Sequence, residues 1–508
     1  MTQTATPAGT EVLATRVFPR FYRDSVALMA LASALEKREG IVRVGAVMAT
    51  PANLTILEAS QMLPADLTAA ADDLVVVARG IDEETAQAAL DAAEEGLVSV
   101  ETSSGARAER APQTIAEGIA AAAGADRPAT LATVSVPGTY APVVVEQALD
   151  AGLHVFCFSD NVSVADERRL KEKAVGAGLL LMGPDCGTAV LDGTPLGFAN
   201  AVRPGTIGIV AASGTGAQEV SCLVDRAGAG VSQLIGVGGR DLTEEIGGLM
   251  THLALDRLET DEATRVVVVV SKPPAPAVAD ALLARLERVA AGGTPVVACL
   301  LGLDDRGEPG ADSLVVRGTL EGGALAAAEL AGHPLVIDDP LLPAARVAAG
   351  RVLGLYAGGT LASEAKILLG RAGVAAEVLD LGDDQYTAGR PHPMIDPQAR
   401  AERIAAAGSD PTVAIVLCDV VLGFGSAADP ATPVAEAVRT AREAARADGH
   451  ELVVVASVCA AVGDHQGLDA QRSILRAAGI VVADSNAAAA RAAIALTTTD
   501  PSTTEVTA

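Results

Sequence analysis

A run of small polar residues, Ala211-Ala212-Ser213-Gly214-Thr215-Gly216, is the segment of the sequence best suited to bind an anion. It comes directly after a predicted strand (Ile207–Ala211) and opens a predicted helix, so its two glycines let backbone N–H groups approach an anion while Ser213 and Thr215 add hydroxyl donors. The segment has no Gly-Lys-Ser/Thr ending and is therefore not a P-loop. We expect an anion site here; the alternative is a tight turn capped by Ser or Thr.

Two further glycine turns follow predicted strands in the last third of the sequence. Gly358-Gly359-Thr360 comes after the strand 352–356, and the segment 418–427, which includes Gly425 and Ser426, leads from another strand end to the next helix. One glycine turn is weak support for a binding site. Three turns after three strands predict several sites for anions or nucleotide fragments, two of which can face one another across a domain interface.

Three charged or reactive side chains lie in strand-end segments. Arg240, which follows Gly239 in the run Gly-Val-Gly-Gly-Arg-Asp, has the geometry to pair with a phosphate or a carboxylate. A salt bridge to Asp241 or a nearby Glu is the equal alternative. Lys272 follows a buried strand, where strand ends present ligands, although a solvated lysine is nearly as well supported. Cys186 has no adjacent histidine to lower its pKa, so we expect a structural thiol.

The loop 383–397 combines Tyr386, Arg390 and His392 with several acids between prolines. An arginine and a histidine on a rigid loop beside a glycine-lined pocket would clamp a carboxylate and donate a proton. A surface loop or a domain contact is the alternative. The remaining histidines have neither an i, i+4 pair nor metal-ligand spacing, and the sequence therefore predicts no metal site.

Charge and composition exclude several classes of function. The 508 residues carry 37 Lys and Arg against 64 Asp and Glu, a net charge of −27, which repels nucleic acids and anionic membranes. Aromatic residues make up 2% of the sequence, too few for a base-stacking surface. The six cysteines form no Cys-x-x-Cys pair, no apolar run approaches the roughly 20 residues that span a bilayer, and no signal peptide is recognised, so we expect a cytoplasmic protein.

The alternation of strand-like and helical segments predicts an α/β protein made of tandem Rossmann-like and flavodoxin-like, doubly wound parallel sheets, preceded by a small α+β domain. Residues 11–102 are typical of a small βαββαβ sandwich, and a linker with one helix follows at 103–127. Three parallel α/β units follow, the first over 129–182. The expected domains are 1–127, 128–199, 200–345 and 346–508, the last with a polar tail.

Ten motifs identify a resemblance to the FdrA family, relatives of succinyl-CoA synthetase, over nearly the whole length. They are Tyr22-Arg-Asp-Ser-Val, Thr50-Pro-Ala-Asn, Phe158-Ser-Asp-Asn-Val, Met182-Gly-Pro-Asp-Cys-Gly-Thr, Gly193-Thr-Pro-Leu, Ala212-Ser-Gly-Thr-Gly, Gly236-Val-Gly-Gly-Arg-Asp-Leu, Ser271-Lys-Pro-Pro, Tyr356-Ala-Gly-Gly-Thr-Leu and the loop from Leu381 to Pro397.

The resemblance implies a role for each domain. Residues 128–199 would correspond to the CoA-binding domain of the synthetase α-subunit, 200–345 to its ligase domain, and 346–508 to the carboxy-terminal ligase domain of the β-subunit. Both halves of the phosphate site would then lie in one chain, Ser213–Gly216 at one helix start and Gly425–Ala427 at the other. The implied CoA-type pocket consists of Val136, Pro137, Gly138, Asn161, Pro184 and Asp185.

Departures from the synthetase pattern change the expected chemistry. Succinyl-CoA synthetase carries phosphate on a histidine, but the corresponding segment here, 299–330, contains no histidine. Ser271-Lys272 replaces the glutamate that would orient that histidine, and no ATP-grasp module is recognised in the sequence. A phosphohistidine relay is therefore not expected, whereas the anion site remains.

A direct transfer is typical of this pattern, because FdrA proteins resemble the large subunit of oxamate carbamoyltransferase. That enzyme, with partner subunits, converts oxalurate and phosphate to oxamate and carbamoyl phosphate in purine (allantoin) catabolism. In this interpretation phosphate at the facing helix starts attacks the ureido carbonyl, Arg240 or Arg390 holds the carboxylate, Lys272 faces the anions and His392 donates a proton. No cofactor is required, and the expected partners are other subunits or further copies of the chain.

Two alternatives stay open. An acyl-CoA ligase of the succinyl-CoA type would bind CoA at the Rossmann-type domain and would need a separate ATP-grasp partner. A non-catalytic scaffold would bind CoA or a nucleotide and organise partner subunits. The N-terminal domain carries no catalytic constellation, and we expect it to serve assembly or regulation.

Overall fold

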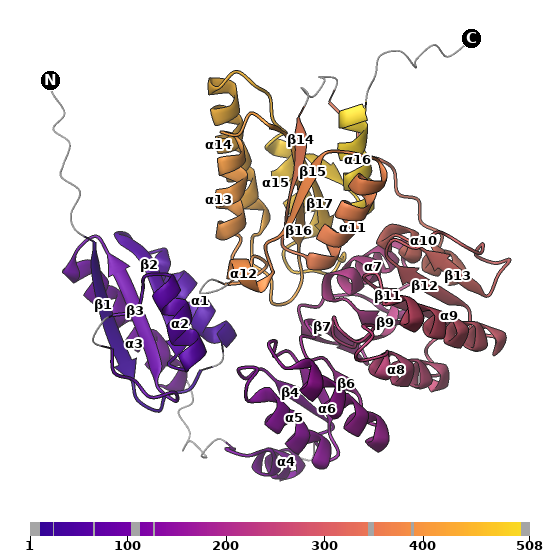
Figure 1. The fold of residues 1–508 in the computed structure, drawn as a ribbon, viewed down its shortest axis with the longest axis horizontal. Helices are drawn as coiled ribbons and strands as arrows, with labels where there is room; N and C mark the ends of the chain where they lie inside the picture. The colour runs from indigo at the N-terminus through magenta and orange to yellow at the C-terminus, as the bar shows by residue number, and fades with distance from the viewer. Residues whose placement is uncertain are drawn as a thin grey trace. The chain divides into compact units, whose positions relative to one another are not determined.

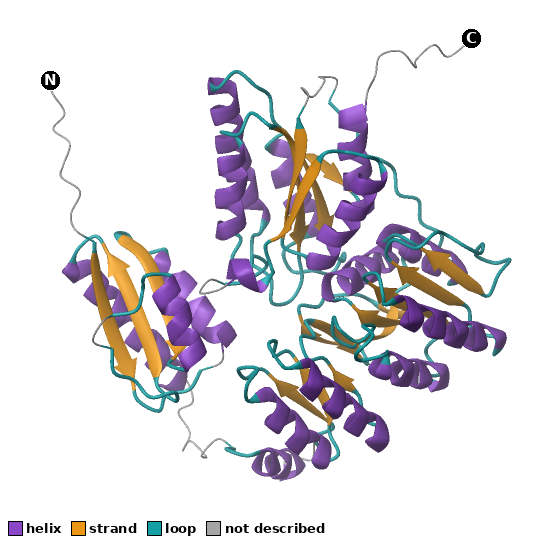
Figure 2. Ribbon diagram, in the orientation of Figure 1, coloured by secondary structure: helices purple, strands orange, loops and turns teal. Residues whose placement is uncertain are grey.

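A computed structural model describes residues 11–23, 25–64, 67–102, 112–124, 128–343, 350–387 and 391–498. The chain divides into two units, one formed by residues 1–121 with 384–391 and the other by residues 122–383 with 392–508. Figure 1 follows the chain through its successive sheets, and Figure 2 shows that helices accompany every one of them.

The first unit is built on a three-stranded antiparallel sheet. Its elements are β1 (Val12–Phe18), α1 (Ser25–Glu36), β2 (Ile41–Met48), α2 (Pro51–Ala59), β3 (Leu74–Gly80), α3 (Glu83–Thr102) and α12 (Asp384–Thr387), and α4 (Ile115–Gly124) follows α3 in the chain. The strand order is β1-β3-β2 (Figure 2). Both faces of the central strand are buried, since Val76 packs with apolar residues of α1 and α3, and Val75 with Leu57 of α2.

The expected βαββαβ order is wrong in its second half. The observed order is βαβαβα, with one helix after each of the three strands. Helix α3 follows β3 where a fourth strand was expected, because residues 83–102 form one helix rich in Ala and Glu, both strong helix formers. The predicted linker at 103–127 lies outside the described residues except for 112–124, which include α4.

Three short parallel strands open the second unit. The elements are β4 (Leu131–Val134), α5 (Ala141–Asp150), β5 (His154–Cys157), α6 (Val164–Ala177) and β6 (Leu181–Met182). The strands lie in chain order, so this sheet has no reversal and is simpler than the doubly wound sheet expected for 129–182. The hairpin β7 (Thr188–Leu191) and β8 (Thr194–Gly197), which falls within the segment expected to belong here, joins the edge of the next sheet instead.

The largest sheet contains a flavodoxin-like core. Its further elements are β9 (Pro204–Ala212), α7 (Gly214–Ala227), β10 (Val231–Gly236), α8 (Leu249–Thr260), β11 (Val266–Ser271), α9 (Pro276–Ala291), β12 (Val296–Leu300), β13 (Leu314–Arg317) and α10 (Leu320–Leu330). The strand order is β13-β12-β11-β9-β10-β7-β8. The five strands from β9 onward are parallel and follow the 2-1-3-4-5 order of a doubly wound sheet.

The last sheet repeats this topology. Its elements are β14 (Arg351–Tyr356), α11 (Gly359–Arg371), β15 (Ala376–Asp380), α13 (Gln398–Ala407), β16 (Val413–Val421), α14 (Ala431–Ala447), β17 (Val453–Cys459), α15 (Leu468–Ala477), β18 (Val481–Ala483) and α16 (Asn486–Thr498). The parallel order β15-β14-β16-β17-β18 is again 2-1-3-4-5. In such sheets ligands bind at the carboxyl ends of the strands, next to the first strand, where the order reverses.

The two flavodoxin-like sheets share one apolar core, in which α7 and α10 pack against α11 and α16. Two buried glutamates at equivalent helix positions join them. Glu219 of α7 accepts a hydrogen bond from the Asn486 N–H at the start of α16 (2.9 Å), and Glu364 of α11 accepts one from the Leu320 N–H at the start of α10 (2.6 Å). The first helix of each sheet therefore caps the last helix of the other. The predicted α/β class with tandem parallel sheets is confirmed.

None of the helices in the described part of the chain has the length and apolar character of a bilayer-spanning segment.

Candidate functional site

The starts of α7 and α11 meet where the two flavodoxin-like sheets share their core. Ser213 caps α7 by accepting a hydrogen bond from the Gly216 N–H (3.1 Å), and its Oγ lies 2.7 Å from the Thr360 Oγ1 at the start of α11. The Thr360 N–H donates to the Thr215 Oγ1 (3.3 Å). A Cβ at Gly216 would lie 2.3 Å from the Ser213 Oγ, so the junction requires glycine. The first glycine turn thus pairs with the turn at 358–360.

The prediction that Gly425 and Ser426 form the second helix start is wrong. The helix that follows them, α14, begins only at Ala431. A Cβ at Gly425 would lie 2.9 Å from the Phe198 ring, so this turn packs against the residue after β8. The three glycine turns look alike locally, and only the packing of the two sheets selects which pair meets.

The N–H groups before α11 are occupied by a carboxylate of the protein. Asp419, buried in β16, accepts hydrogen bonds from the Ala357 N–H (2.8 Å) and the Gly358 N–H (2.7 Å), and its Oδ1 pairs with the Arg400 Nη1 (2.8 Å). An external anion would compete with this carboxylate, so the free anion-binding capacity lies on the α7 side. Asp419 was not singled out in the sequence, although one acid within the apolar run Val413–Val421 is a usable signal.

Lys272 and Asp380 lie beside the same junction. Ser271, the last residue of β11, pairs with Ala212 of β9, so Lys272 follows at the level of the α7 cap. Asp380 ends β15. A Cβ placed on Gly359 would lie 2.2 Å from the Asp380 Oδ2 and 3.4 Å from the Lys272 Nζ. The carboxylate and the ammonium group therefore flank one point next to the start of α11.

The Asp380 carboxyl group titrates close to neutrality. Burial raises its pKa to about 6, while the Gly382 N–H that it accepts (3.0 Å) and the positive charge of Lys272 act in the opposite direction. Sequence reasoning missed Asp380; its signal is an acid at the carboxyl end of a predicted strand. In the ranges that the structure describes, no group of His, Cys, Asp and Glu side chains is arranged to hold a metal ion.

His392 does not have the properties that the sequence suggested. Its ring packs against Phe198 (centroids 5.8 Å apart), and its Nδ1 accepts a hydrogen bond from the Met394 N–H (3.2 Å). Burial, and next the charge of Arg400, lowers its pKa to about 4, so the ring is neutral at pH 7. The structure therefore does not support His392 as the proton donor that the sequence suggested. Arg390 lies outside the described residues.

A narrow pocket opens at the exposed side of the α7 start. Its walls come from the segment after β6, the end of β9 and the loop after β10: Asp185, Cys186, Gly187, Thr188, Ala211, Ser213, Gly214, Gly236, Gly238 and Gly239. A Cβ at Gly239 would have only the Asp185 Oδ2, at 4.0 Å, near it. Asp185 from the CoA-type set thus meets Ser213, Gly214 and Gly239 from the phosphate set. Burial raises the pKa of the Cys186 thiol to about 12, as suits a structural cysteine.

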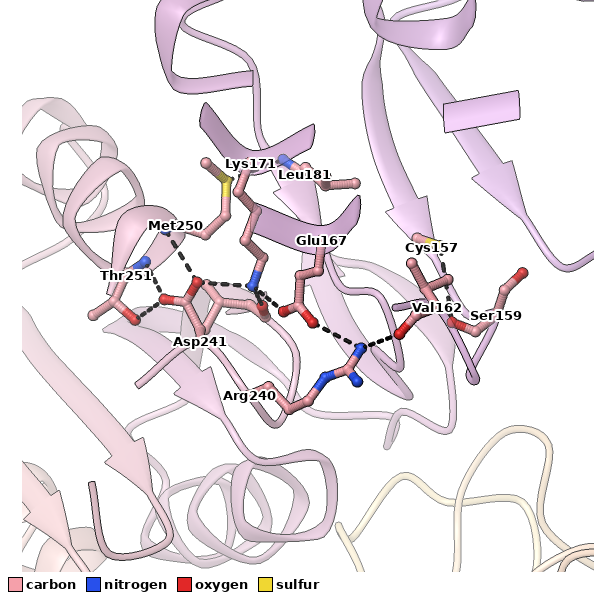
Figure 3. A network of polar contacts seen from close by, with 11 residues as sticks. Cys157, Ser159, Val162, Glu167, Lys171, Leu181, Arg240, Asp241, Met250 and Thr251 are labelled. Carbon is pink, nitrogen blue, oxygen red and sulfur yellow. Dashed lines mark hydrogen bonds and ion pairs between the residues drawn. The ribbon is translucent and has the colours of Figure 1, made fainter. Parts of the chain in front are cut away.

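A buried ionic network holds the glycine-rich loop 236–241, three of whose glycines line this pocket (Figure 3). We call this segment the glycine loop. The Lys171 Nζ of α6 pairs with the Glu167 Oε1 and the Asp241 Oδ1, each at 2.8 Å, and donates to the Val237 carbonyl (2.9 Å). Asp241 also accepts two backbone N–H bonds at the start of α8. All three charged side chains are fully buried. The network therefore ties α6 to the loop that lines the pocket.

Arg240 belongs to this network and is not a lining residue of the pocket. Its guanidinium pairs with the Glu167 Oε2 (2.8 Å) and donates to the Val162 carbonyl (2.8 Å), as Figure 3 shows. The prediction that Arg240 binds a substrate anion is therefore wrong, and the alternative of a salt bridge to a nearby glutamate is what the structure contains.

The predicted CoA-type residues gather at the carboxyl ends of the three-stranded sheet. The Ser159 Oγ accepts the Val136 N–H (3.0 Å), and the Ser159 carbonyl accepts the Asp185 N–H (2.9 Å). A Cβ at Gly138 would lie 2.2 Å from a backbone carbonyl of the next turn, where Asn161 has a left-handed φ of 52°. The turns that carry the predicted set are therefore packed together, and the set, Val136, Pro137, Gly138, Asn161, Pro184 and Asp185, contains no cationic side chain.

Three family models match parts of the chain. The model described as CoA-ligase matches residues 355–496, the CoA binding domain matches 202–300, and a model described as "AllF, heavy metal-associated domain" matches 10–113. Residues 10–113 contain neither cysteine nor histidine, so the side chains that heavy metals prefer do not occur there.

Solved structures of CoA-dependent enzymes are similar at low sequence identity. The dinucleotide-forming acetyl-coenzyme A synthetase 1 of Ca. Korarchaeum cryptofilum is 15% identical, with a TM-score of 0.31 over 72% of this chain and 82% of that chain. ATP citrate lyase from Methanothrix soehngenii is 14% identical, with a TM-score of 0.35 over 59% of this chain and 56% of that chain.

Curated relatives match at higher identity. The α2 subunit of an ADP-forming succinate–CoA ligase from Archaeoglobus fulgidus is 32% identical over 148 residues, 28% of this chain and 50% of that subunit. The chain thus spans about half the length of this subunit. The uncharacterized protein YahF of Escherichia coli strain K12 is 39% identical over 507 residues, 92% of this chain and 95% of YahF. The chain therefore carries CoA-binding and CoA-ligase domains like those of succinyl-CoA synthetase, and it belongs to the same family as YahF.

Proposed function

We propose that this chain is a subunit of a CoA ligase of the succinyl-CoA synthetase kind, and that its own step moves an acyl group between phosphate and a thiol. An acyl phosphate and CoA give a thioester and inorganic phosphate: the acyl C–O bond to phosphate breaks, the C–S bond forms, and the thiol proton ends on phosphate. The observation that carries the proposal is the junction of two helix starts, with the Ser213 Oγ 2.7 Å from the Thr360 Oγ1 and Lys272 beside it.

The α7 side of this junction is the proposed phosphate position. Gly214, the first residue of α7, is exposed and lines the narrow pocket. The positive end of the helix dipole favours a bound anion by about 0.3–1 kcal/mol, and the Lys272 ammonium adds a full charge. The Asp419 carboxylate already accepts hydrogen bonds from the N–H groups before α11. One phosphate position, on the α7 side, is therefore expected.

The glycine-lined pocket is the proposed channel for the thiol-bearing arm of CoA. Gly239 and Gly214 leave space where a side chain would stand, since a Cβ on either has no neighbour closer than 3.6 Å. The cavity measures only about 10 Å³, so we propose that it receives no more than the thiol end of that arm. The nucleotide end of CoA needs cations that the predicted CoA-type set does not contain, and we leave it to residues beyond that set.

A partner subunit is proposed for the nucleotide-dependent step. The relatives from Archaeoglobus fulgidus are ADP-forming ligases and are described as α-subunits. In the proposed assembly the partner makes the acyl phosphate from ATP and a carboxylate, and this chain transfers its acyl group to CoA.

Carbamoyl transfer is the second candidate. It rests on the lack of a histidine in the segment 299–330 and on Lys272 at the end of β11, a combination that suits direct handling of phosphate without a covalent carrier. The chain resembles the large subunit of oxamate carbamoyltransferase. In the reaction of that enzyme, carbamoyl phosphate and oxamate give oxalurate and phosphate. The same phosphate position serves both candidates, and the acceptor distinguishes them.

The test uses the purified full chain with two substrate pairs. Acetyl phosphate with CoA should give thioester and phosphate, and carbamoyl phosphate with oxamate should give no phosphate above the rate without protein. CoA should also raise the unfolding temperature; at about 100 times its dissociation constant a ligand stabilises by about 2.7 kcal/mol. Phosphate release with the second pair alone would replace the ligase by the carbamoyltransferase. Neither reaction, with no shift by CoA, would overturn both.

A matched pair of lysine variants tests the phosphate position. Lys272→Met should weaken sulfate binding about tenfold or more, because a charge-assisted hydrogen bond contributes about 1.5–3 kcal/mol. Lys366→Met, on the exposed side of α11, makes the same chemical change away from the junction and should leave sulfate binding unaltered. Equal effects of the two substitutions would remove Lys272 from the site. Isothermal titration measures both affinities.

A further inference from the structure

We infer that Asp380 is the proton-transferring residue of this site, acting on the X–H group of the acceptor as that group attacks the acyl carbon of an acyl phosphate. The inference rests on the proposed function and names the residue that moves the proton. The acceptor atom X is the sulfur of a thiol for a ligase and the nitrogen of an amide for a carbamoyltransferase.

The position of Asp380 is the first argument. Asp380 stands at the carboxyl end of β15, and its Oδ2 lies 2.2 Å from the point that a Cβ on Gly359 would occupy, with the Lys272 Nζ 3.4 Å from the same point. Its Oδ1 accepts the Gly382 N–H (3.0 Å), which fixes the carboxyl group, and no described residue donates a hydrogen bond to its Oδ2. This oxygen therefore packs directly against the backbone of Gly359 at the start of α11, on the side where Lys272 lies. The proposal places the X–H group of the acceptor next to this oxygen, beside the phosphate position.

The other titratable groups at the junction are not suited to the task. Asp419 has both carboxylate oxygens engaged by N–H donors and by Arg400. His392 is neutral and buried against Phe198, with its pKa lowered to about 4 by burial. The Cys186 thiol has its pKa raised to about 12 by burial. Compared with these three groups, Asp380 combines a position beside Lys272 with a carboxylate oxygen to which no described residue donates a hydrogen bond.

The electrostatic surroundings of Asp380 suit proton transfer near neutrality. Burial raises its pKa to about 6, with Asp419 of β16 and Asp383 of its own loop acting in the same direction and Lys272 of β11 acting against it. General acid–base catalysis is most efficient when the pKa of the group lies near the working pH. At pH 7 the group is mostly ionised and can accept a proton.

The step balances without an additional reactant. The acceptor X–H passes its proton to the Asp380 Oδ2 while X forms a bond to the acyl carbon. The C–O bond to phosphate breaks, and its electron pair stays with the phosphate oxygen. Asp380 then gives the proton to the departing phosphate and returns to its ionised form. The ammonium group of Lys272 offsets the charge of the phosphate.

Asp380→Asn in the full chain is the first test. Asparagine keeps the shape of the side chain and can still accept the Gly382 N–H, but it cannot carry the proton. We expect turnover with acetyl phosphate and CoA, or with carboxylate-bearing oxamate and carbamoyl phosphate, to fall by about 10²–10⁴-fold, the usual contribution of general acid–base catalysis. The fall in rate of the unchanged protein below about pH 6 should disappear in the variant.

Glu377→Gln is the matched control, since it removes one negative charge at the amino end of the same strand, where Glu377 forms a half-exposed ion pair with Arg351. Its turnover and pH profile should equal those of the unchanged protein. If Asp380→Asn retains at least a third of the turnover and the same pH profile, Asp380 does not transfer the proton.

Sulfate binding gives a second readout that needs no turnover. Sulfate keeps its charge between pH 5 and 8, so a change in its affinity reports on the protein. The affinity should fall as the pH rises through about 6, where Asp380 becomes negative, and this step should vanish in Asp380→Asn. An unchanged step in the variant would place Asp380 away from the anion. If neither substrate pair reacts but the step vanishes, the proposed function fails while the position of Asp380 at the anion site stands.

Discussion

Lys171→Met removes the cation at the centre of the buried network in Figure 3. In the intact chain, the Lys171 Nζ lies 2.8 Å from carboxylate oxygens of Glu167 and Asp241 and 2.9 Å from the Val237 carbonyl, and the three charged side chains are inaccessible to water. Methionine fills nearly the same volume and leaves two buried carboxylates and one carbonyl without that donor. The loss is therefore one of charge compensation, with little change in packing.

Its magnitude follows from the partners that remain. Removing one member of a buried ion pair costs about 3–5 kcal/mol, because an uncompensated charge is left in a low-dielectric interior. Glu167 keeps the Arg240 guanidinium at 2.8 Å, and Asp241 keeps its backbone N–H bonds at the start of α8. These contacts place the expected loss at the lower end of that range, about 3 kcal/mol.

Urea titration followed by circular dichroism measures the free energy of unfolding, and hydrogen exchange of the amides in 237–241 reports on the glycine loop itself. Lys173→Met is the control, since it makes the same change two residues further along α6, where the lysine is 32% exposed and pairs with Glu146 and Asp150. That variant should lose about 0–1 kcal/mol. Adding Glu167→Gln and Asp241→Asn to Lys171→Met should recover part of the loss. A Lys171→Met variant within 1 kcal/mol of the unchanged chain would refute the reasoning.

Three further predictions concern burial and space. Burial raises the pKa of Glu364 from 4.5 to about 7, so between these pH values the group is protonated in the folded chain and ionised in the unfolded chain. The free energy of unfolding should therefore fall by up to about 3 kcal/mol as the pH rises through that window. In urea titrations at a series of pH values, Glu364→Gln should flatten this slope. The six cysteines are all buried, so a thiol reagent should label the folded chain slowly and the urea-unfolded chain rapidly; rapid labelling of the folded chain would contradict the structure. Gly359→Ala sets a methyl group 2.2 Å from the Asp380 Oδ2 and should weaken sulfate binding at least tenfold. Gly370→Ala, on the same helix with nothing within 4 Å of its Cβ, should leave sulfate binding unchanged. Isothermal titration measures the sulfate affinity of both variants.

The fold class could be predicted because its signals are local. Runs such as Val266–Ser271 and Val413–Val421 are apolar throughout, as strands covered on both faces must be. Small-residue turns after strands marked where helices begin, and Ser213 caps α7 as its position indicated. The N-terminal unit departed from expectation where 83–102 form one helix and no fourth strand, because the pattern of a repeated βαβ unit was extended beyond what those residues favour.

The candidate site could be predicted only in part. Ser213, Gly214, Thr215 and Gly216 lie at the junction with 358–360, and Lys272 lies beside it. Other assignments failed for reasons of tertiary structure. Arg240 forms an ion pair with a buried glutamate of α6, and His392 packs against an aromatic ring. The turn at 425–426 packs against Phe198 instead of starting a helix. In each case the residue type suited the chemistry, but its neighbours came from distant parts of the chain.

The sequence by itself determined the alternation of strands and helices in the parallel sheets, the helix starts at Ser213 and at 358–360, and the resemblance to the synthetase family. Only the tertiary structure decided which helix starts meet, which carboxylate fills the turn before α11, and which acid keeps a free oxygen at the site. The physical reason is range. A cap or an apolar run acts over a few residues, whereas Ser213 and Thr360 are 147 positions apart, and the pKa of Asp380 depends on burial by β-strands and loops that the chain brings together only on folding.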